Sequence, residues 1–289
     1  MNERTNRKIS KIEVSVVIPV FNGEKTLKQC LNSVLNQTYK NYEVIIVDNS
    51  STDRTKEIIK KFEQKDKKIK YFFESRRARG AARYKGEINS QGEIVLMTDS
   101  DCIVPDNWIE EMIKPITSKQ CIAVQGMLKP AIRNYWTRQY QKEKERIIRD
   151  RLTDRKIGLL DTANFAIKKD VLKEIGYSNP NIMVGHDTEL EFRLKNYNHN
   201  IMFKDIQVFH HHPNTMLKTG GKFFERGKWN EKITPVNKIE KSLFVCSNTL
   251  RFIGGLVFYL VTFNKDFLYY LVSGTAWRLG ILWTRIKNI

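Results

Sequence analysis

Residues 14–48, VSVVIPVFNGEKTLKQCLNSVLNQTYKNYEVIIVD, decide the fold class of this chain. The continuous apolar runs at 14–20 and 43–47 are typical of strands that are buried on both faces. Between them, residues 27–35 place apolar side chains at spacings of three and four, which indicates one apolar helix face. A strand, a helix and a second strand in this order predict a parallel βαβ unit.

The same alternation continues as far as residue 98. Further strands are expected at 69–73 and 93–98, with a helix before each of them. We therefore expect an α/β fold with a doubly wound, mostly parallel sheet. Beyond residue 101 the alternation loosens, and the patterns predict helices at 106–118, 133–152, 169–175 and 186–197 and strands at 121–127, 160–167 and 201–209.

Two carboxylates, Asp99 and Asp101, directly follow the apolar run at 93–98. Ligands of open α/β sheets bind at the carboxyl ends of the strands. Hard oxygen ligands at such a place suit Mg²⁺ or Mn²⁺, which often keep coordination positions for a substrate phosphate. Because acidic residues also cluster in ordinary loops, Asp99 and Asp101 alone do not establish a metal site, and the rest of the chain has to support it.

The charge of the chain favours anionic partners. Its 50 Lys and Arg residues exceed its 32 Asp and Glu residues, which leaves a net charge of +18. Nucleotide phosphates, lipid head groups and nucleic acid all remain open on this ground. The 4 cysteines are scattered, so we expect reduced core residues of a cytosol-facing protein and neither a disulfide framework nor a zinc site.

The C-terminal region has a different composition. Its apolar runs at 252–264 and 267–277 are shorter than the roughly 20 residues that a spanning helix needs. They favour a helical hairpin that lies in one leaflet of a membrane, with basic residues at its ends. A helical pair that docks on the catalytic domain or on a second copy is the alternative. We expect the boundary near Pro235, between a domain at 1–235 and a membrane-associated region at 236–289.

Several motifs resemble the family 2 glycosyltransferases. They are residues 14–53, residues 80–101 (GAARYKGEINSQGEIVLMTDSD), residues 162–176 (TANFAIKKDVLKEIG) and residues 185–194 (GHDTELEFRL), in the order in which the family has them. Enzymes of this family have the GT-A fold and transfer a sugar from a nucleotide donor with inversion. The resemblance extends to Trp229 and therefore covers most of the chain.

The resemblance implies a donor site at the first strand ends. Its nucleotide-sugar-binding residues would be Pro19, Phe21, Glu24, Asp48, Arg79, Arg83 and Asp99. Asp48 would accept a hydrogen bond from the base, and the two arginines would face the diphosphate. For Phe21, packing of the turn is an equal alternative. Tyr84 stands where the family often has Asn.

The resemblance also implies a metal site. Asp101 would be the direct ligand of Mn²⁺ or Mg²⁺, and Asp99 would assist it or face the sugar. A histidine of the run 210–212 would complete the set. Neighbouring residues of a strand point to opposite faces, so the three cannot all converge on one site, and we favour His210 and, after it, His212. The alternative is a polar strand end without metal. The cation would neutralise the leaving nucleoside diphosphate.

Asp187 aligns with the catalytic base of the family. A carboxylate at that position would take the proton of the acceptor hydroxyl, although a helix N-cap is the structural alternative. His186 replaces the usual Glu and would tune Asp187 or contact the acceptor. Asn164 and Trp229 are further acceptor-side candidates. Trp229 ends ERGKW, which is similar to the Q-x-x-R-W of processive synthases with Lys in place of Arg.

Together these features predict a metal-dependent inverting glycosyltransferase at the cytoplasmic face of a membrane. It would move one sugar from a nucleotide-diphosphate sugar to a lipid-linked glycan or a polyprenyl phosphate. It would associate with the membrane surface and through its C-terminal helices with a second copy. One alternative is a sugar-phosphate nucleotidyltransferase of similar fold. The other is a non-catalytic protein that binds anionic lipid or nucleic acid, but carboxylates at the strand ends would repel a phosphate backbone.

Overall fold

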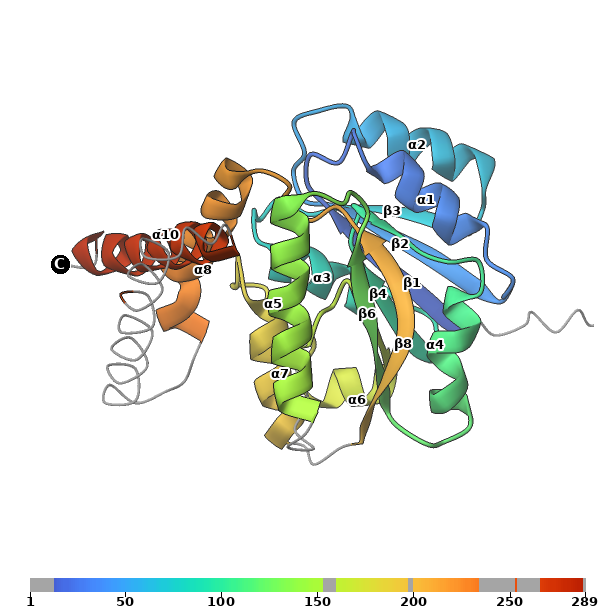
Figure 1. Ribbon diagram of the computed structural model, residues 1–289. Helices are drawn as coiled ribbons and strands as arrows, with labels where there is room; N and C mark the ends of the chain where they lie inside the picture. Colours follow the sequence, from blue (N-terminus) through green and yellow to red (C-terminus); the bar gives the residue numbers. More distant parts are fainter. Residues whose placement is uncertain (1–12, 153–159, 197–199, 234–252, 254–265, 288–289) are drawn as a thin grey trace, which may run out of the picture.

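The structure is a computed structural model of the 289-residue chain that describes residues 13–152, 160–196, 200–233, 253 and 266–287 (Figure 1). Its strands are β1 (Val14–Val20), β2 (Tyr42–Asp48), β3 (Ile69–Phe73), β4 (Ile94–Thr98), β5 (Cys102–Ile103), β6 (Ala123–Pro130), β7 (Asn164–Lys168) and β8 (Ile201–His210). Its helices are α1 (Leu27–Leu35), α2 (Thr55–Lys65), α3 (Arg79–Ile88), α4 (Trp108–Thr117), α5 (Tyr135–Leu152), α6 (Lys169–Glu174), α7 (His186–Asn196), α8 (Met216–Ile233) and α10 (Asp266–Lys287).

Within the described residues, the strands form one eight-stranded sheet in the order β3-β2-β1-β4-β7-β6-β8-β5. The first four of these strands are parallel, as the βαβ pattern predicts. β7 then runs antiparallel to β4 and β6, β8 runs parallel to β6, and β5 runs antiparallel to β8. The α/β prediction is therefore confirmed, with a mixed half that begins at β7.

Helices cover both faces of the sheet, which explains why its strands are apolar without alternation. Val16 of β1 packs in a core cluster with residues of α1, α2 and α4. The next residue, Val17, lies in a second cluster with residues of α3, α6 and α7. Successive side chains of one strand thus fill two separate cores, and both clusters exclude water from the sheet.

The topology brings several polar strand ends to one edge. Asp48 ends β2, and Asp99 to Asp101 follow the parallel strand β4. The short strand β5 then pairs with the end of β8, so that Cys102 lies opposite His210. A carboxylate after residue 98 and a histidine more than a hundred residues later therefore become neighbours.

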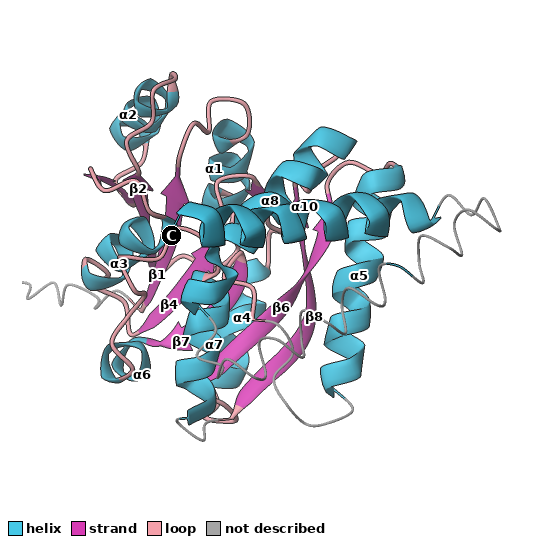
Figure 2. Cartoon of the chain, turned by 90° about the vertical axis from the view of Figure 1, so that its left-hand side faces the viewer, coloured by secondary structure: helices cyan, strands magenta, loops and turns pink. Residues whose placement is uncertain are grey.

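The C-terminal helix α10 packs along α8 and also contacts α5 (Figure 2). The two helices approach closely at glycines: a Cβ added to Gly227 would lie 2.0 Å from the carbonyl oxygen of Trp277, and one added to Gly280 would lie 2.1 Å from that of Phe224. The predicted apolar run at 267–277 is thus part of a longer helix, and the run at 252–264 lies outside the described residues except for Ile253. No helix in the described ranges has both the length and the apolar character needed to cross a bilayer.

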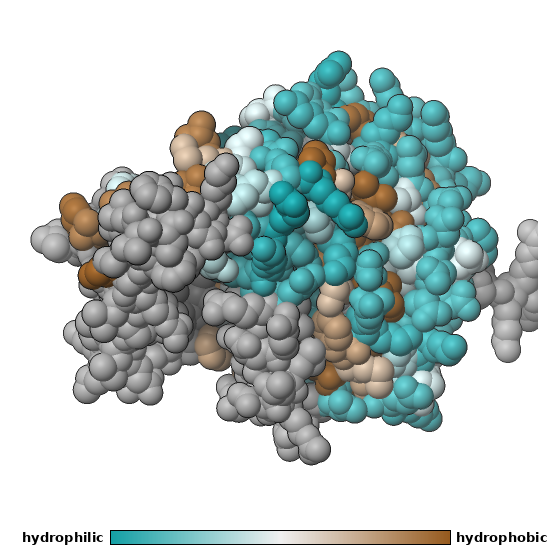
Figure 3. Space-filling model, viewed as in Figure 1, coloured by the Kyte–Doolittle hydropathy of each residue, from teal (hydrophilic) through white to brown (hydrophobic). Residues whose placement is uncertain are grey.

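The surface is uneven in polarity. Figure 3 shows hydrophilic side chains over most of the described face of the sheet domain and hydrophobic side chains over α8 and α10. On α10 the exposed apolar side chains include Leu279, Leu282 and Ile286, which are 52 %, 53 % and 63 % exposed. Within the described residues, α10 therefore packs one side against α8 and leaves apolar side chains exposed on another.

Candidate functional site

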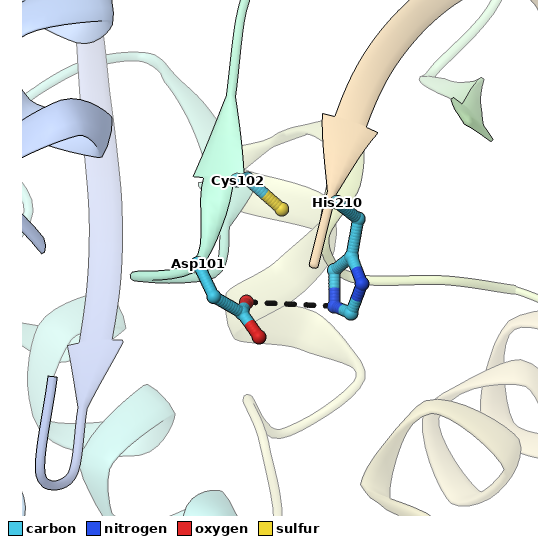
Figure 4. Close-up of side chains that lie close together, drawn as sticks. All are labelled: Asp101, Cys102 and His210. Carbon is cyan, nitrogen blue, oxygen red and sulfur yellow. Dashed lines mark ion pairs between the residues drawn. The ribbon is translucent and has the colours of Figure 1, made fainter. Parts of the chain in front are cut away.

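Asp101 and His210 point toward one another from the ends of adjacent strands (Figure 4). The Nε2 atom of His210 lies 3.4 Å from Oδ1 of Asp101. Cys102 is close enough to complete a group of three potential metal ligands. Burial, with the nearby charges of Asp101 and Asp99, holds the pKa of the Cys102 thiol well above its usual value, so this side chain stays protonated.

The remaining pair fits a hard divalent cation. An imidazole nitrogen and a carboxylate oxygen are both acceptable ligands of Mn²⁺, whereas a neutral thiol is not. Burial lowers the pKa of His210, which favours the neutral ring that a metal ligand requires. The Asp101 side chain is 36 % exposed, which leaves room for a ligand phosphate beside it.

Arg83 connects the two sides of the site. Its side chain is 2 % exposed, and Nη2 forms an ion pair with Oδ1 of Asp99. Its Nε donates to Nε2 of His186 at 2.8 Å, and Nη1 donates to the carbonyl oxygen of Thr162 at 3.5 Å. Burial by itself would raise the pKa of Asp99, but Arg83, His210 and Arg79 together outweigh it and lower the pKa. Asp99 is therefore held as a carboxylate.

Asp187 lies at the start of α7 beside this arginine. Its Oδ1 accepts hydrogen bonds from the hydroxyl of Thr162 and, at 3.3 Å, from the backbone N–H of Thr162. It also lies 3.0 Å from Nε2 of His186. Burial would raise its pKa, but the neighbouring His186 and Arg83 and the hydrogen bond from Thr162 together hold the pKa below its ordinary value. The carboxylate is thus ionised and 32 % exposed, as a proton acceptor must be.

The site therefore combines a ligand pair for a cation with an ionised, partly exposed carboxylate. This arrangement suits the departure of a phosphate-bearing leaving group and the deprotonation of an attacking hydroxyl. The model of the family described as "Glycosyl transferase family 2" matches residues 15–176 of this 289-residue chain. The chain belongs to glycosyl transferase family 2.

Curated relatives agree with this assignment. Glycosyltransferase AglE of Haloferax volcanii is 27 % identical over 231 residues, which are 78 % of this chain and 75 % of AglE. Glycosyltransferase GlyA of Streptococcus pneumoniae is 37 % identical over 108 residues, but the match spans only 16 % of GlyA. The predicted family and the predicted enzyme class, glycosyltransferase, are confirmed.

Solved structures agree on the fold. The mannosyltransferase PcManGT from Pyrobaculum calidifontis, solved in complex with GDP-Man and Mn²⁺, is 13 % identical and has a TM-score of 0.66 over 96 % of this chain and 88 % of that chain. Residues 1–349 of S. aureus TarS are 17 % identical, with a TM-score of 0.55 over 95 % of this chain and 92 % of that chain. The GT-A fold is therefore confirmed for this glycosyltransferase.

The nucleotide-side candidates lie around the ends of β1 and β2. Asp48 is buried, and its Oδ1 accepts a hydrogen bond from the backbone N–H of Ser51 at 3.0 Å. Phe21 is 51 % exposed, and the Arg77 guanidinium lies over its ring, 5.5 Å from the centroid. Glu24 forms an ion pair with Arg54 at 3.5 Å. Pro19 is half-buried in β1, and Arg79 is exposed at the start of α3.

Asn164 lies in the core and not at an open surface. Its Oδ1 accepts from the indole N–H of Trp108 at 2.9 Å, and Nδ2 donates to the carbonyl oxygens of Met127 and Ile206 at 3.0 and 2.8 Å. The side chain is 0 % exposed, and a Cβ added to Gly126 would lie 2.2 Å from it. Asn164 therefore bridges β7 to β6 and β8 where β6 is irregular.

The other acceptor-side candidates, His186 and Trp229, lie on two different helices, α7 and α8. His186 is buried against Arg83, and its Nδ1 has no hydrogen-bond partner in the described part of the chain. Trp229 lies half-buried on α8. The reasoning from sequence did not find Thr162 as a partner of Asp187 or His212 as a partner of His210. The sequence around Thr162 and His212 contains no pattern that indicates these contacts, because the partners come together only in the folded chain.

Proposed function

We propose that this family 2 glycosyltransferase transfers one sugar, with inversion and with the help of Mn²⁺ or Mg²⁺, from a nucleotide-diphosphate sugar to a membrane-held acceptor. The observation that carries the proposal is the position of Asp187, Asp99 and Asp101 around one buried arginine, Arg83, and one strand-end histidine. The sugar would react between the carboxylate of Asp187 and the diphosphate.

The donor would bind at the ends of β1, β2 and β4. Asp48, Pro19 of β1 and the turn residues Phe21 and Glu24 would contact the base and ribose. Arg79 would approach the diphosphate from the start of α3. Arg83 already donates to protein partners, so we assign it mainly to holding Asp99 and His186 in place. A cation on Asp101 and His210 would neutralise charge on the leaving diphosphate.

The acceptor would attack from the side of α7. Asp187 would take the hydroxyl proton, because its carboxylate is ionised and reachable from solvent. Thr162 orients Oδ1 of this carboxylate, so the proton would be taken mainly by the other oxygen. Trp229 would stack on a sugar ring, and His186 would position Asp187.

The acceptor would be lipid-linked, a glycan or a polyprenyl phosphate. The net charge of +18 and the exposed apolar side chains of α10 support a position at an anionic membrane surface. In this proposal residues 1–235 form the catalytic domain and residues 236–289 form the membrane-associated region.

The test is release of nucleoside diphosphate by the purified protein in native-like lipid. UDP- and GDP-sugars are each supplied with Mn²⁺, with Mg²⁺ or with EDTA, beside the Asp187→Asn variant. Release from one donor that needs both metal and Asp187 would support the proposal and name the donor. Release of inorganic pyrophosphate from a nucleoside triphosphate and a sugar phosphate would support the nucleotidyltransferase alternative. That result would overturn the proposed sugar transfer.

A further inference from the structure

Four side chains from α5, β6 and the end of β8 continue behind His210, away from Asp101. Nδ1 of His210 lies 2.9 Å from Nδ1 of His212. Nε2 of His212 lies 3.3 Å from Oε1 of Gln141, and Nε2 of Gln141 lies 2.9 Å from Oε1 of Glu145. Lys129 donates to the same oxygen of Glu145 at 2.9 Å. His210, His212 and Gln141 are all buried.

The carboxylate of Glu145 determines which groups donate and which accept along this chain of hydrogen bonds. Glu145 bonds through a carboxylate oxygen, which accepts here from both Lys129 and Gln141. The amide of Gln141 therefore turns its NH₂ group to Glu145 and its oxygen to His212. An amide oxygen only accepts, so Nε2 of His212 carries the proton of that contact.

The same donor and acceptor roles then determine which nitrogen is protonated in each histidine ring. With its proton on Nε2, a neutral His212 has a bare Nδ1, and the 2.9 Å contact needs a proton on Nδ1 of His210. In the neutral ring, which a metal ligand must be, Nε2 of His210 is then bare and faces Oδ1 of Asp101 at 3.4 Å. Two lone-pair atoms that face each other at this distance are complementary to a cation and repel each other without one.

We propose that Gln141 and His212 are positioning residues that hold His210 in the tautomer whose bare Nε2 faces Asp101. This inference rests on the proposed function, in which Asp101 and His210 bind the divalent cation. Partners behind a ligating histidine fix its tautomer and ring orientation, and their loss typically weakens metal binding by about 10- to 100-fold. Glu145 sets the orientation of Gln141, so the selection of the tautomer begins on α5, three hydrogen bonds behind the ligating ring.

Two variants separate this role from simple packing. Gln141→Leu keeps most of the volume but removes the amide oxygen, and we expect about tenfold weaker Mn²⁺ binding by titration of the free-ion electron spin resonance signal. The exchange Gln141→Glu with Glu145→Gln keeps an acceptor toward Nε2 of His212, because the carboxylate introduced at position 141 would accept from that atom and from the amide introduced at position 145. It gives up only the contact of Lys129, which donates to the same oxygen of Glu145 as Gln141 does. This double variant should bind Mn²⁺ as the wild type does. Equal weakening in both variants would overturn the inference.

A second readout needs no metal. In protein with ¹⁵N-labelled histidine, two-bond ¹⁵N–¹H spectra distinguish rings protonated on Nδ1 from rings protonated on Nε2. We expect the Nδ1–H form for His210 and the Nε2–H form for His212, and a mixture at His210 in Gln141→Leu. The opposite assignment in the wild type would overturn the inference.

The control His210→Ala distinguishes the two proposals. Unchanged Mn²⁺ affinity in this variant would refute the metal site itself, and with it the positioning role. Weak binding in His210→Ala together with wild-type binding in Gln141→Leu would refute the positioning role alone and leave the metal site standing.

Discussion

At the scale of single residues, Asp187 is the group on which the proposed chemistry depends most. The Asp187→Asn variant keeps the size of the side chain and can still accept from Thr162 through its amide oxygen, but it can no longer take a proton. We expect transfer to fall by at least about 10²-fold, the usual contribution of a general base. Binding of the nucleoside diphosphate should persist. Activity assays and calorimetric titration measure the two quantities.

The exposed carboxylate Asp170 on α6 provides the matched control. Asp170→Asn removes the same charge away from the site and should leave both quantities unchanged. A parallel loss of transfer and nucleotide binding in Asp187→Asn would mean that Asp187 supports the structure of the site and does not act as its base.

Asn164 provides a second residue-scale prediction. Asn164→Ala leaves an indole N–H and two carbonyl oxygens unpaired in the core. Since each unsatisfied buried group costs about 1–3 kcal/mol, we expect the free energy of unfolding to fall by about 3 kcal/mol or more in urea denaturation. The exposed Asn32 on α1 is the control, because Asn32→Ala should have little effect. Undiminished stability with lost transfer would instead favour an acceptor-side role for Asn164.

These residues also show what a sequence can and cannot predict about a site. Asp99 and Asp101 are predictable because they directly follow an apolar run, and the run itself marks the edge of the sheet. The contacts among Arg83, His186 and Thr162 join segments that are 79 and 103 residues apart, so no local pattern contains them. The same holds for Asn164, whose residue type indicates a polar contact but not whether the partner is a ligand or the core.

At the scale of elements, the close contact between α8 and α10 depends on glycines. An alanine at Gly227 or Gly280 would bring a methyl group within 2.0 or 2.1 Å of a backbone oxygen of the other helix. These backbones cannot yield locally, so we expect both variants to separate α10 from α8. Limited proteolysis should cut α10 faster in each of them, and the melting temperature should fall.

Gly221, which lies on α8 like Gly227, is the matched control. An added Cβ there meets nothing within 4 Å, and alanine is a better helix former by about 1 kcal/mol. Gly221→Ala should therefore leave α10 protected and the melting temperature equal or higher. Proteolysis of α10 that is the same in all three variants would show that the glycine contacts do not hold the helix.

Helix α8 also explains a failure of prediction at this scale. Three of its residues, Gly220, Gly221 and Gly227, are poor helix formers, so its local pattern does not indicate a helix. Packing against α10 stabilises this helix, although its intrinsic helix propensity is low. The strand β5 has only two residues, and its existence depends on the pairing with the end of β8. By contrast, the first four strands and the helices between them are predictable, since each strand is a mainly apolar run and each helix has one apolar face.

At the scale of the whole molecule, the parallel half of the sheet follows from the alternation of strands and helices, because a crossover of fixed hand leaves few other arrangements. The mixed half does not follow, since β7 pairs with β4 across about 70 residues and β6 pairs with β8 across a similar distance. The proposed base, Asp187, and the proposed metal ligand, His210, belong to the part of the chain that builds this mixed half. The functional assignment therefore depended on family motifs more than on periodicity.

The distribution of charge and apolar surface over the whole molecule makes membrane binding testable. The net charge of +18 should draw the protein to vesicles that contain anionic phosphatidylglycerol, and added salt should weaken this attraction. Neutral phosphatidylcholine vesicles lack the electrostatic contribution and should bind weakly in a sedimentation assay.

The apolar contribution is tested on α10. Leu279 and Leu282 are more than half exposed, and replacing both with Asp removes apolar area and adds two negative charges. We expect anionic-vesicle binding to fall by at least about tenfold, since burial of each leucine contributes on the order of 1.5–3 kcal/mol. Ile88→Asp, at the exposed end of α3, adds a similar charge to a 43 % exposed apolar position and should change binding far less. If the α10 double variant binds as the wild type does, the described face of α10 is not the membrane contact, and the basic surface alone accounts for the attraction.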